Sequence, residues 1–101
     1  MIDKTSESHG EVMRRRLRKS QRFAAEYLKE TLQGTDDLGV LLIALRRIAE
    51  ARGGIAKVAK AAGIQRESLY RALSAKGNPR LSTINAVAKA VGLKLTLESA
   101  R

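Results

Sequence analysis

The sequence has no cysteine, a single histidine, a single proline and only 3% aromatic residues. Without cysteine, the chain can form neither a disulfide framework nor a thiolate metal site. The histidine, His9, stands near the N-terminus in a polar stretch, and we interpret it as incidental rather than catalytic. The shortage of aromatic rings leaves little material for the base-stacking platforms of proteins that bind single-stranded nucleic acid.

Catalytic and membrane-spanning patterns are also missing from the sequence. It contains no paired carboxylate constellation, no Ser/His or Cys/His set and no phosphate loop, and the glycine pair at residues 53–54 lacks the strand context of a nucleotide-binding fingerprint. The apolar stretch at residues 38–45 has roughly a third of the length that crosses a bilayer. Residues 1–10 contain no apolar run like that of a secretory signal. We therefore expect a cytoplasmic protein that is not an enzyme, spans no membrane and uses neither a metal nor a cofactor.

Acidic residues are scarce compared with basic ones, 10 against 20, which gives a formal net charge of +10. Such a charge predicts a polyanionic partner, either nucleic acid or an anionic membrane surface. The 101 residues suffice for one small domain with an additional arm, and their 44% hydrophobic share suits a modest core of packed helices. We expect an all-α protein.

In residues 55–73 the helical period of apolar residues stops at one glycine and then resumes. Gly63 stands where the first helix ends and the chain turns, in a left-handed backbone that glycine adopts without a Cβ clash. Ala59, four residues earlier, is small enough to let two helices cross closely. The apolar positions are Val58, Ala59 and Ala62 before the glycine, and Leu69, Ala72 and Leu73 after it. This spacing predicts a helix-turn-helix unit whose second helix lies in a DNA major groove.

Basic residues dominate the surroundings of this unit. Between residues 52 and 80 there are seven basic residues and one acidic residue, Glu67. The basic residues are Arg52, Lys57, Lys60, Arg66, Arg71, Lys76 and Arg80. A small helical hairpin with an ordinary solvated charged face is the alternative, but DNA binding explains the pattern better.

The N-terminal third divides into a polar tail and a basic helix. Residues 1–10 are predicted to be a disordered tail, and residues 11–34 a single amphipathic helical arm ended by Gly34. Apolar residues gather on one side of this arm, and Arg14, Arg15, Arg18, Lys19 and Arg22 on the other. Such a helix can lie on a membrane, contact DNA phosphates or pack on the domain with its arginines in water. For residues 23–32 we favour packing, whereas the role of residues 14–22 stays open.

Residues 35–101 are expected to form the helix-turn-helix DNA-binding domain. Thr35 or Asp36 can cap a strongly apolar helix that the glycines at 53–54 end, and Ser82 can cap a last helix that ends at Gly92. Residues 93–97 then alternate between apolar and polar, the period of a half-buried strand. Such a strand would pair with a second subunit, with another protein or with nothing.

Two runs of residues, 63–73 and 77–84, resemble the Cro and phage-repressor class of helix-turn-helix proteins. More narrowly, the chain from about residue 23 to residue 97 resembles the probable addiction-module antidote proteins, small antitoxins encoded beside a toxin of the RelE/ParE-like class. The narrower resemblance rests on residues 25–28 (AEYL), 48–53 (IAEARG), 66–70 (RESLY) and 77–79 (GNP). It implies a compact helical bundle of the phage-repressor type, in a repressor of its own operon that also neutralises a toxin.

Three residues of the second helix are predicted to read bases, namely Arg66, Glu67 and Arg71. Arginine can bind guanine O6 and N7 in bidentate fashion, and a carboxylate can accept a hydrogen bond from cytosine N4. Glu67 has an alternative role, because an acidic residue in the first turn stabilises the helix start and can orient Arg71. Leu69 is expected to point into the core.

Phosphate or groove-edge contacts are predicted on both sides of this helix, where they would hold the protein in register without reading sequence. The candidates are Gly54, Lys57, Gln65, Tyr70, Lys76, Asn78 and Arg80, with Arg14, Arg15, Arg18 and Arg22 as accessory contacts. We expect a homodimer on an inverted repeat of double-stranded DNA, since one such helix reads only a few base pairs. Two alternatives remain: a basic module that binds membrane or RNA through residues 14–22, or a phage-type repressor without a toxin partner.

Overall fold

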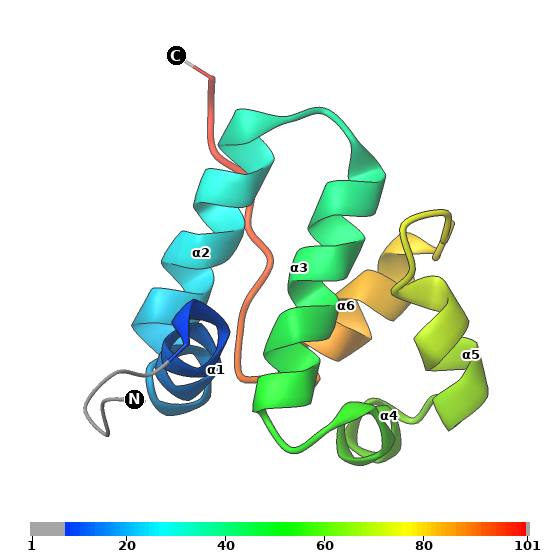
Figure 1. Cartoon of the computed structure of the whole chain (residues 1–101). Helices are drawn as coiled ribbons and strands as arrows, with labels where there is room; N and C mark the ends of the chain where they lie inside the picture. The colour runs from blue at the N-terminus through cyan, green and yellow to red at the C-terminus, as the bar shows by residue number, and fades with distance from the viewer. Residues whose placement is uncertain (1–7, 101) are drawn as a thin grey trace, which may run out of the picture.

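The computed structural model describes residues 8–100, and every regular element in this range is a helix. The six helices are α1 (His9–Lys19), α2 (Gln21–Gly34), α3 (Leu38–Ala51), α4 (Ile55–Ala62), α5 (Arg66–Ala72) and α6 (Leu81–Ala90). Helix α3 runs through the middle of the molecule, with α1 and α2 on one side and α4, α5 and α6 on the other (Figure 1). The predicted all-α fold class is therefore confirmed.

Helix α3 occupies this central place because apolar residues cover most of its circumference. Seven of its residues are buried, and it contacts α1, α2 and α4. The largest fully buried side chains of the core are Leu17, Leu42, Ile48, Leu69, Leu73 and Val87. They come from both sides of α3, so α1 shares one core with the glycine-turn unit.

The N-terminal arm is two helices, and the prediction of a single helix over residues 11–34 is wrong. Ser20 adopts an extended backbone (φ −123°, ψ 112°), and its side-chain oxygen accepts a hydrogen bond from the Phe23 N–H at 3.0 Å. A serine that satisfies a free N–H in this way starts a new helix. In the same manner Ser8 caps α1, which begins at His9. Residues 1–7 of the predicted tail lie outside the described residues.

Two of the predicted caps are displaced. Helix α3 is capped by Asp37 rather than by Thr35 or Asp36, because the Asp37 carboxylate accepts from the Gly39 N–H at 2.8 Å. Helix α6 begins at Leu81, before the predicted cap Ser82, because the Arg80 carbonyl already accepts from the Ile84 N–H at 3.1 Å.

No strand forms in residues 93–97 of the single chain, which agrees with the alternative that this segment pairs with nothing within residues 8–100. The chain leaves α6 at Gly92 (φ +82°) and runs on in an irregular course, with Leu97 fully exposed. An alternating sequence becomes a strand only when a neighbouring strand satisfies its N–H and C=O groups. Residues 8–100 contain no such neighbour.

Arg52 joins three separate parts of the fold. Its Nε donates to the Leu17 carbonyl at 2.8 Å, and its Nη1 donates to the Val91 carbonyl at 3.1 Å. These carbonyls lie near the C-terminal ends of α1 and α6, where a cation is favourable. The third nitrogen, Nη2, is buried and has no hydrogen-bond partner among residues 8–100. Arg52, counted in the sequence among the basic residues around the DNA-binding unit, is thus committed to holding α1 and α6 on the end of α3.

Replacing this arginine should destabilise the whole fold. We expect Arg52→Met to lower the free energy of unfolding by about 1.5–3 kcal/mol, the usual range for hydrogen bonds to a charged group. The matched change Arg18→Met, at an exposed position of α1, should alter it by less than about 0.5 kcal/mol. Urea denaturation followed by circular dichroism measures both values, and equal losses in the two variants would contradict this role of Arg52.

Candidate nucleic-acid interface

The unit of α4, a three-residue turn and α5 has the connectivity of a helix-turn-helix. Gly63 ends α4 in the left-handed conformation (φ +73°, ψ 31°), as its place in the sequence predicted. The Ile64 N–H donates to the Ala59 carbonyl at 2.9 Å across the turn, which satisfies a free carbonyl at the end of α4. Ala59 itself is 2% exposed, so its small side chain lies where the helices pack. The geometry is consistent with the unit that the sequence predicted.

Helix α5 separates one buried face from one exposed face. Leu69 is fully buried, as predicted, whereas Arg66, Glu67 and Arg71 are exposed. These three side chains and Tyr70 together line one surface depression on α5. The three predicted base readers are therefore neighbours on the outer face of the helix.

A residue that the sequence did not single out also reaches this face. The guanidinium carbon of Arg46, on α3, lies 4.1 Å from the centre of the Tyr70 ring, in a cation–π contact. Its Nε lies 3.7 Å from a carboxylate oxygen of Glu50. Arg46 thus packs against the half-exposed Tyr70 ring. The two residues are far apart in the sequence, so no local pattern could have indicated their contact.

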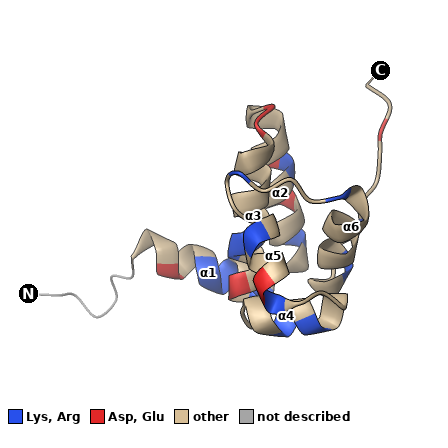
Figure 2. Cartoon of the chain, turned by 90° about the vertical axis from the view of Figure 1, so that its right-hand side faces the viewer, with Lys and Arg blue, Asp and Glu red and all other residues tan. Residues whose placement is uncertain are grey.

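The predicted phosphate contacts border α5 from two directions. Gly54 is the N-cap of α4 with φ +97°, and Lys57 is exposed on the first turn of that helix. Lys76, Asn78 and Arg80 are exposed in the connection between α5 and α6. Figure 2 looks onto α5 and shows basic segments on α4 and on the neighbouring helices. This arrangement presents positive charge on both sides of the exposed face of α5.

The arginines of the N-terminal arm lie on α1 and at the start of α2. Arg14, Arg15, Arg18 and Arg22 are all exposed. Arg22 forms an ion pair with Glu26, with a distance of 3.5 Å between nitrogen and oxygen, and both side chains are largely in water. Such exposed pairs stabilise little. The exposed pair with Glu26 therefore does not remove Arg22 from the solvent.

The described part of the chain shows neither a candidate metal cluster nor a candidate membrane-spanning helix. Residues 8–100 contain no group of three or more His, Cys, Asp or Glu side chains that could hold a metal ion. Within the same range, no helix has both the length and the apolar character needed to cross a bilayer.

The structure is a small all-α protein in which a glycine turn joins two short helices, an arrangement consistent with a helix-turn-helix. Comparisons with known proteins identify its family. The profile of the family described as "Probable addiction module antidote protein" matches residues 13–99. The chain is also 44% identical over 75 residues to an uncharacterized protein of Haemophilus influenzae, a match that covers 74% of this chain and 75% of the relative. No solved structure matches the chain.

The chain belongs to the family of probable addiction module antidote proteins. An antidote of an addiction module acts on a toxin, so membership implies a toxin as partner.

The two faces of α5 can be tested by one pair of substitutions. Leu69→Ala should lower the free energy of unfolding by about 2–5 kcal/mol, because it removes a fully buried side chain and leaves a cavity. Arg71→Ala, on the exposed face, should leave the melting temperature nearly unchanged. Calorimetry measures both variants, and the reverse ranking would show that the inward and outward faces of α5 are misassigned.

Proposed function

We propose that this antidote is a sequence-specific DNA-binding repressor, which autoregulates its operon in the cytoplasm and neutralises a RelE/ParE-like toxin. The observation that supports the DNA-binding half most directly is the division of α5. Leu69 fixes the helix to the core, and Arg66, Glu67 and Arg71 stand together on its exposed side. The activity requires binding and no bond making, so the protein acts as a regulator rather than an enzyme.

In this proposal α5 enters the major groove and its outer side chains meet base edges. Arg66 and Arg71 bind guanine in bidentate fashion, and Glu67 accepts from cytosine or orients Arg71 four residues later. Gln65 and Tyr70 contact the edge of the groove, where the stack on Arg46 keeps the Tyr70 ring in place. Arg46 also adds a positive charge next to the phosphates.

Phosphate contacts keep α5 in register on the duplex. Lys57 and the backbone amides after Gly54 can hold one strand at the start of α4. The exposed Lys76, Asn78 and Arg80 can hold the backbone on the other side of α5. Arg14, Arg15, Arg18 and Arg22 are accessory contacts of the same kind.

The functional unit in this proposal is a homodimer on an inverted repeat, with two α5 helices in half-sites about 34–36 Å apart. A surface suited to the dimer contact lies between α6 and the C-terminal segment. Its hollow is lined by Leu81, Ser82, Asn85, Leu95, Thr96 and Leu97, none of them charged. Leu81 and Leu97 are 73% and 100% exposed in the single chain. Two chains that each carry +10 repel one another, so an uncharged apolar surface is a favourable place for them to meet.

Sedimentation with and without operator DNA tests the dimer. The wild-type chain should sediment as a dimer and protect both half-sites of the region upstream of its operon. Leu95→Asp should shift it toward the monomer, because the charge would be buried at the contact. Val40→Asp, at a similarly exposed position of α3, should leave the dimer intact. A wild-type chain that binds DNA as a monomer and protects one half-site would overturn the homodimer.

Two pairs of variants can distinguish the recognition of bases from the binding of phosphates. Arg66→Ala and Arg71→Ala should relax base preference at one position per half-site, at a cost of about 1–3 kcal/mol for each bidentate contact. Lys57→Ala and Arg80→Ala should weaken binding to operator and to random duplex alike. In a dimer each removes two phosphate contacts, so the slope of log K against log salt should fall by about two units. Fluorescence anisotropy titrations at several salt concentrations measure these effects. If the Arg66 and Arg71 variants keep full operator preference, α5 is not the reading helix.

The role of the N-terminal arm is best tested with a variant that leaves the fold intact. Leu17 belongs to the core, so deletion of residues 1–22 would disturb packing, and Arg14→Gln/Arg18→Gln/Arg22→Gln is the better variant. A smaller salt slope with unchanged base preference would identify these arginines as phosphate contacts. Unchanged DNA binding, with lost binding to anionic vesicles or RNA, would favour the alternative of a basic module that acts through residues 14–22. A phage-type repressor without a toxin partner is the other alternative, and a gene neighbourhood that lacks a toxin gene would favour it.

A further inference from the structure

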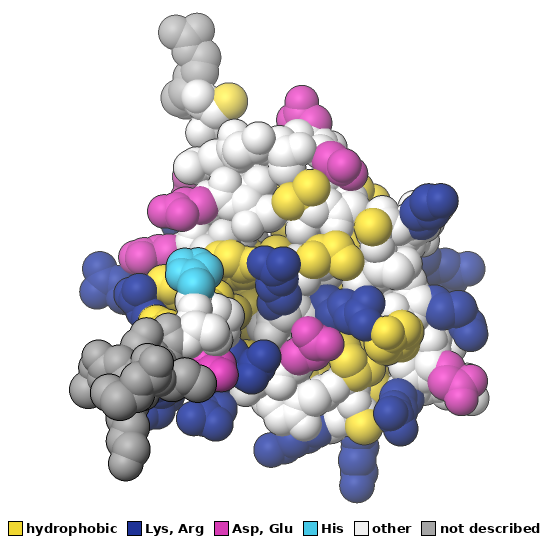
Figure 3. Space-filling model, viewed as in Figure 1, with side chains coloured by type: hydrophobic (Ala, Val, Ile, Leu, Met, Phe, Trp, Pro, Cys, Tyr) yellow, Lys and Arg dark blue, Asp and Glu magenta, His cyan; other side chains and the backbone are white. Residues whose placement is uncertain are grey.

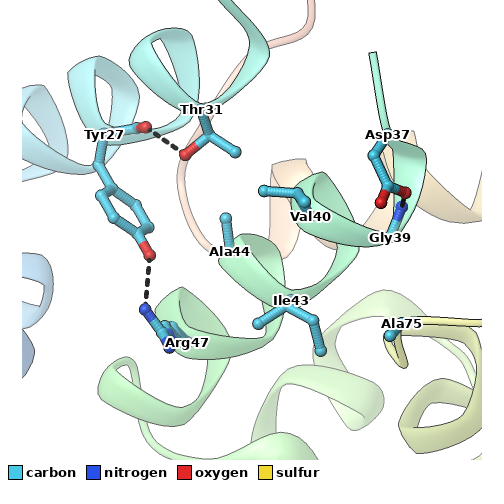
Figure 4. A pocket seen from close by; sticks show the side chains of 9 residues that line it. All are labelled: Tyr27, Thr31, Asp37, Gly39, Val40, Ile43, Ala44, Arg47 and Ala75. Atoms are coloured by element: carbon cyan, nitrogen blue, oxygen red, sulfur yellow. Dashed lines mark hydrogen bonds between the residues drawn. The ribbon is translucent and has the colours of Figure 1, made fainter. Parts of the chain in front are cut away.

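An apolar groove lies between α2 and α3, apart from the residues assigned to DNA. Tyr27 and Thr31 of α2 face Val40, Ile43 and Arg47 of α3 across a hollow of about 280 Å³ (Figure 4). Val40 is 44% exposed, and Ile43 is half-buried. The groove thus presents an apolar centre to the solvent without any contact to fill it among residues 8–100.

Hydrogen bonds hold the walls of this groove in place. The Thr31 hydroxyl donates to the Tyr27 carbonyl at 2.9 Å within α2, and Arg47 Nη1 donates to the Tyr27 hydroxyl at 3.4 Å across the two helices. At the N-terminal end of α3, Asp37 caps the helix. Gly39 is buried there, and any side chain at this position would collide with the carbonyl of Ala75, in the connection between α5 and α6. The groove is therefore formed before a partner arrives, which lowers the entropic cost of binding.

The charge along the α2 side of the groove, and in the turn that follows it, is opposite to that of the whole chain. Residues 26–37 carry four acidic residues and one basic residue, Lys29, a net charge of −3 in a chain of +10, whereas the α3 wall contributes the basic Arg47. The acidic residues are Glu26, Glu30, Asp36 and Asp37, all of them exposed. Figure 3 shows acidic side chains over α2 and over the turn between α2 and α3, with hydrophobic side chains between them. An acidic border repels DNA and disfavours a second copy of this basic chain as the occupant.

We infer that the α2–α3 groove is the docking surface for a basic protein, whose apolar side chains fill the hollow beside Val40 and whose cationic side chains meet the acidic border. This inference rests on the proposed function, in which that protein is the toxin. An interface with an apolar centre and a charged rim has the anatomy of protein–protein contacts in general. The groove shares no residue with the proposed DNA-binding face, so one chain can hold the toxin and DNA at the same time.

The test uses the full chain and the purified product of the toxin gene in the same operon. Val40→Lys should weaken toxin binding about tenfold, because it places a charge in the apolar centre. Glu30→Lys and Asp36→Lys should slow association at low salt, and their effect should fade at about 0.5 M salt, where rim charges are screened. The matched reversal Glu98→Lys, outside the groove, and the DNA-face variant Arg66→Ala should bind toxin as the wild type does. Surface plasmon resonance gives the two rate constants, and anisotropy on operator DNA confirms that the groove variants still bind it with full preference.

The possible outcomes distinguish a failure of the groove assignment from a failure of the proposed toxin binding. Lost toxin binding in the groove variants, with normal operator binding, supports the inference. Wild-type chain that binds the toxin, together with groove variants that bind it equally well, overturns the groove alone. No toxin gene in the operon, or no binding of its product by the wild type, overturns both the inference and the toxin half of the proposed function. If Val40→Lys instead disrupts the dimer, a second copy covers the groove and the inference fails.

Discussion

Burial of α3 on both sides is the constraint on which the rest of the structure depends. Leu42 and Ile48 are fully buried, and apolar residues cover most of the helix, so that only one stripe, with Val40, Arg47 and Glu50, faces water. It therefore needs α1 and α2 on one side and the glycine-turn unit on the other. This requirement places α5 at the outer edge of the molecule, where its buried face carries Leu69 and its exposed face is left for a partner. Arg52 stabilises the same arrangement, because its guanidinium at the end of α3 donates hydrogen bonds to backbone carbonyls near the C-terminal ends of α1 and α6.

Basic and acidic side chains are distributed unevenly over the structure. Positive side chains border α5, whereas the end of the molecule formed by α2 and the start of α3 is acidic. The proposed function requires the chain to bind DNA, which is a polyanion, and a toxin protein. Two surfaces of opposite charge suit two such partners. The surplus of basic residues read from composition thus describes only part of the surface. Arg46 and Tyr70 show a further link, since a side chain of the central helix supports a ring on the proposed DNA-binding face.

Several features were predictable from the sequence because their causes are local. The left-handed turn at Gly63 follows from the four-residue spacing to Ala59 and from the conformational freedom of glycine, and the burial of Leu69 follows from the helical period. The break at Ser20 was missed although serine is a good cap. The apolar period continues across it, from Leu17 to Ala24, and outweighed the cap signal. Residues 93–97 alternate as a strand does, but a period of two carries no information about whether a pairing partner exists, so the sequence left this segment open.

The sequence by itself determined the helical class, the glycine turn, the inward and outward faces of α5, and the excess of positive charge. The first three depend on residues within a few positions of one another, where backbone preference and helical period act directly, and the charge is a sum over the chain that needs no structure. Tertiary structure alone decided that Arg52 would serve the core, that Arg46 would meet Tyr70, and that Tyr27, Val40 and Arg47 would form one groove. The contacts of Arg52 and Arg46, and the hydrogen bond between Arg47 and Tyr27, join residues about twenty or more positions apart. Packing around α3 brings them together, and no local pattern in the chain records which distant side chains that packing selects.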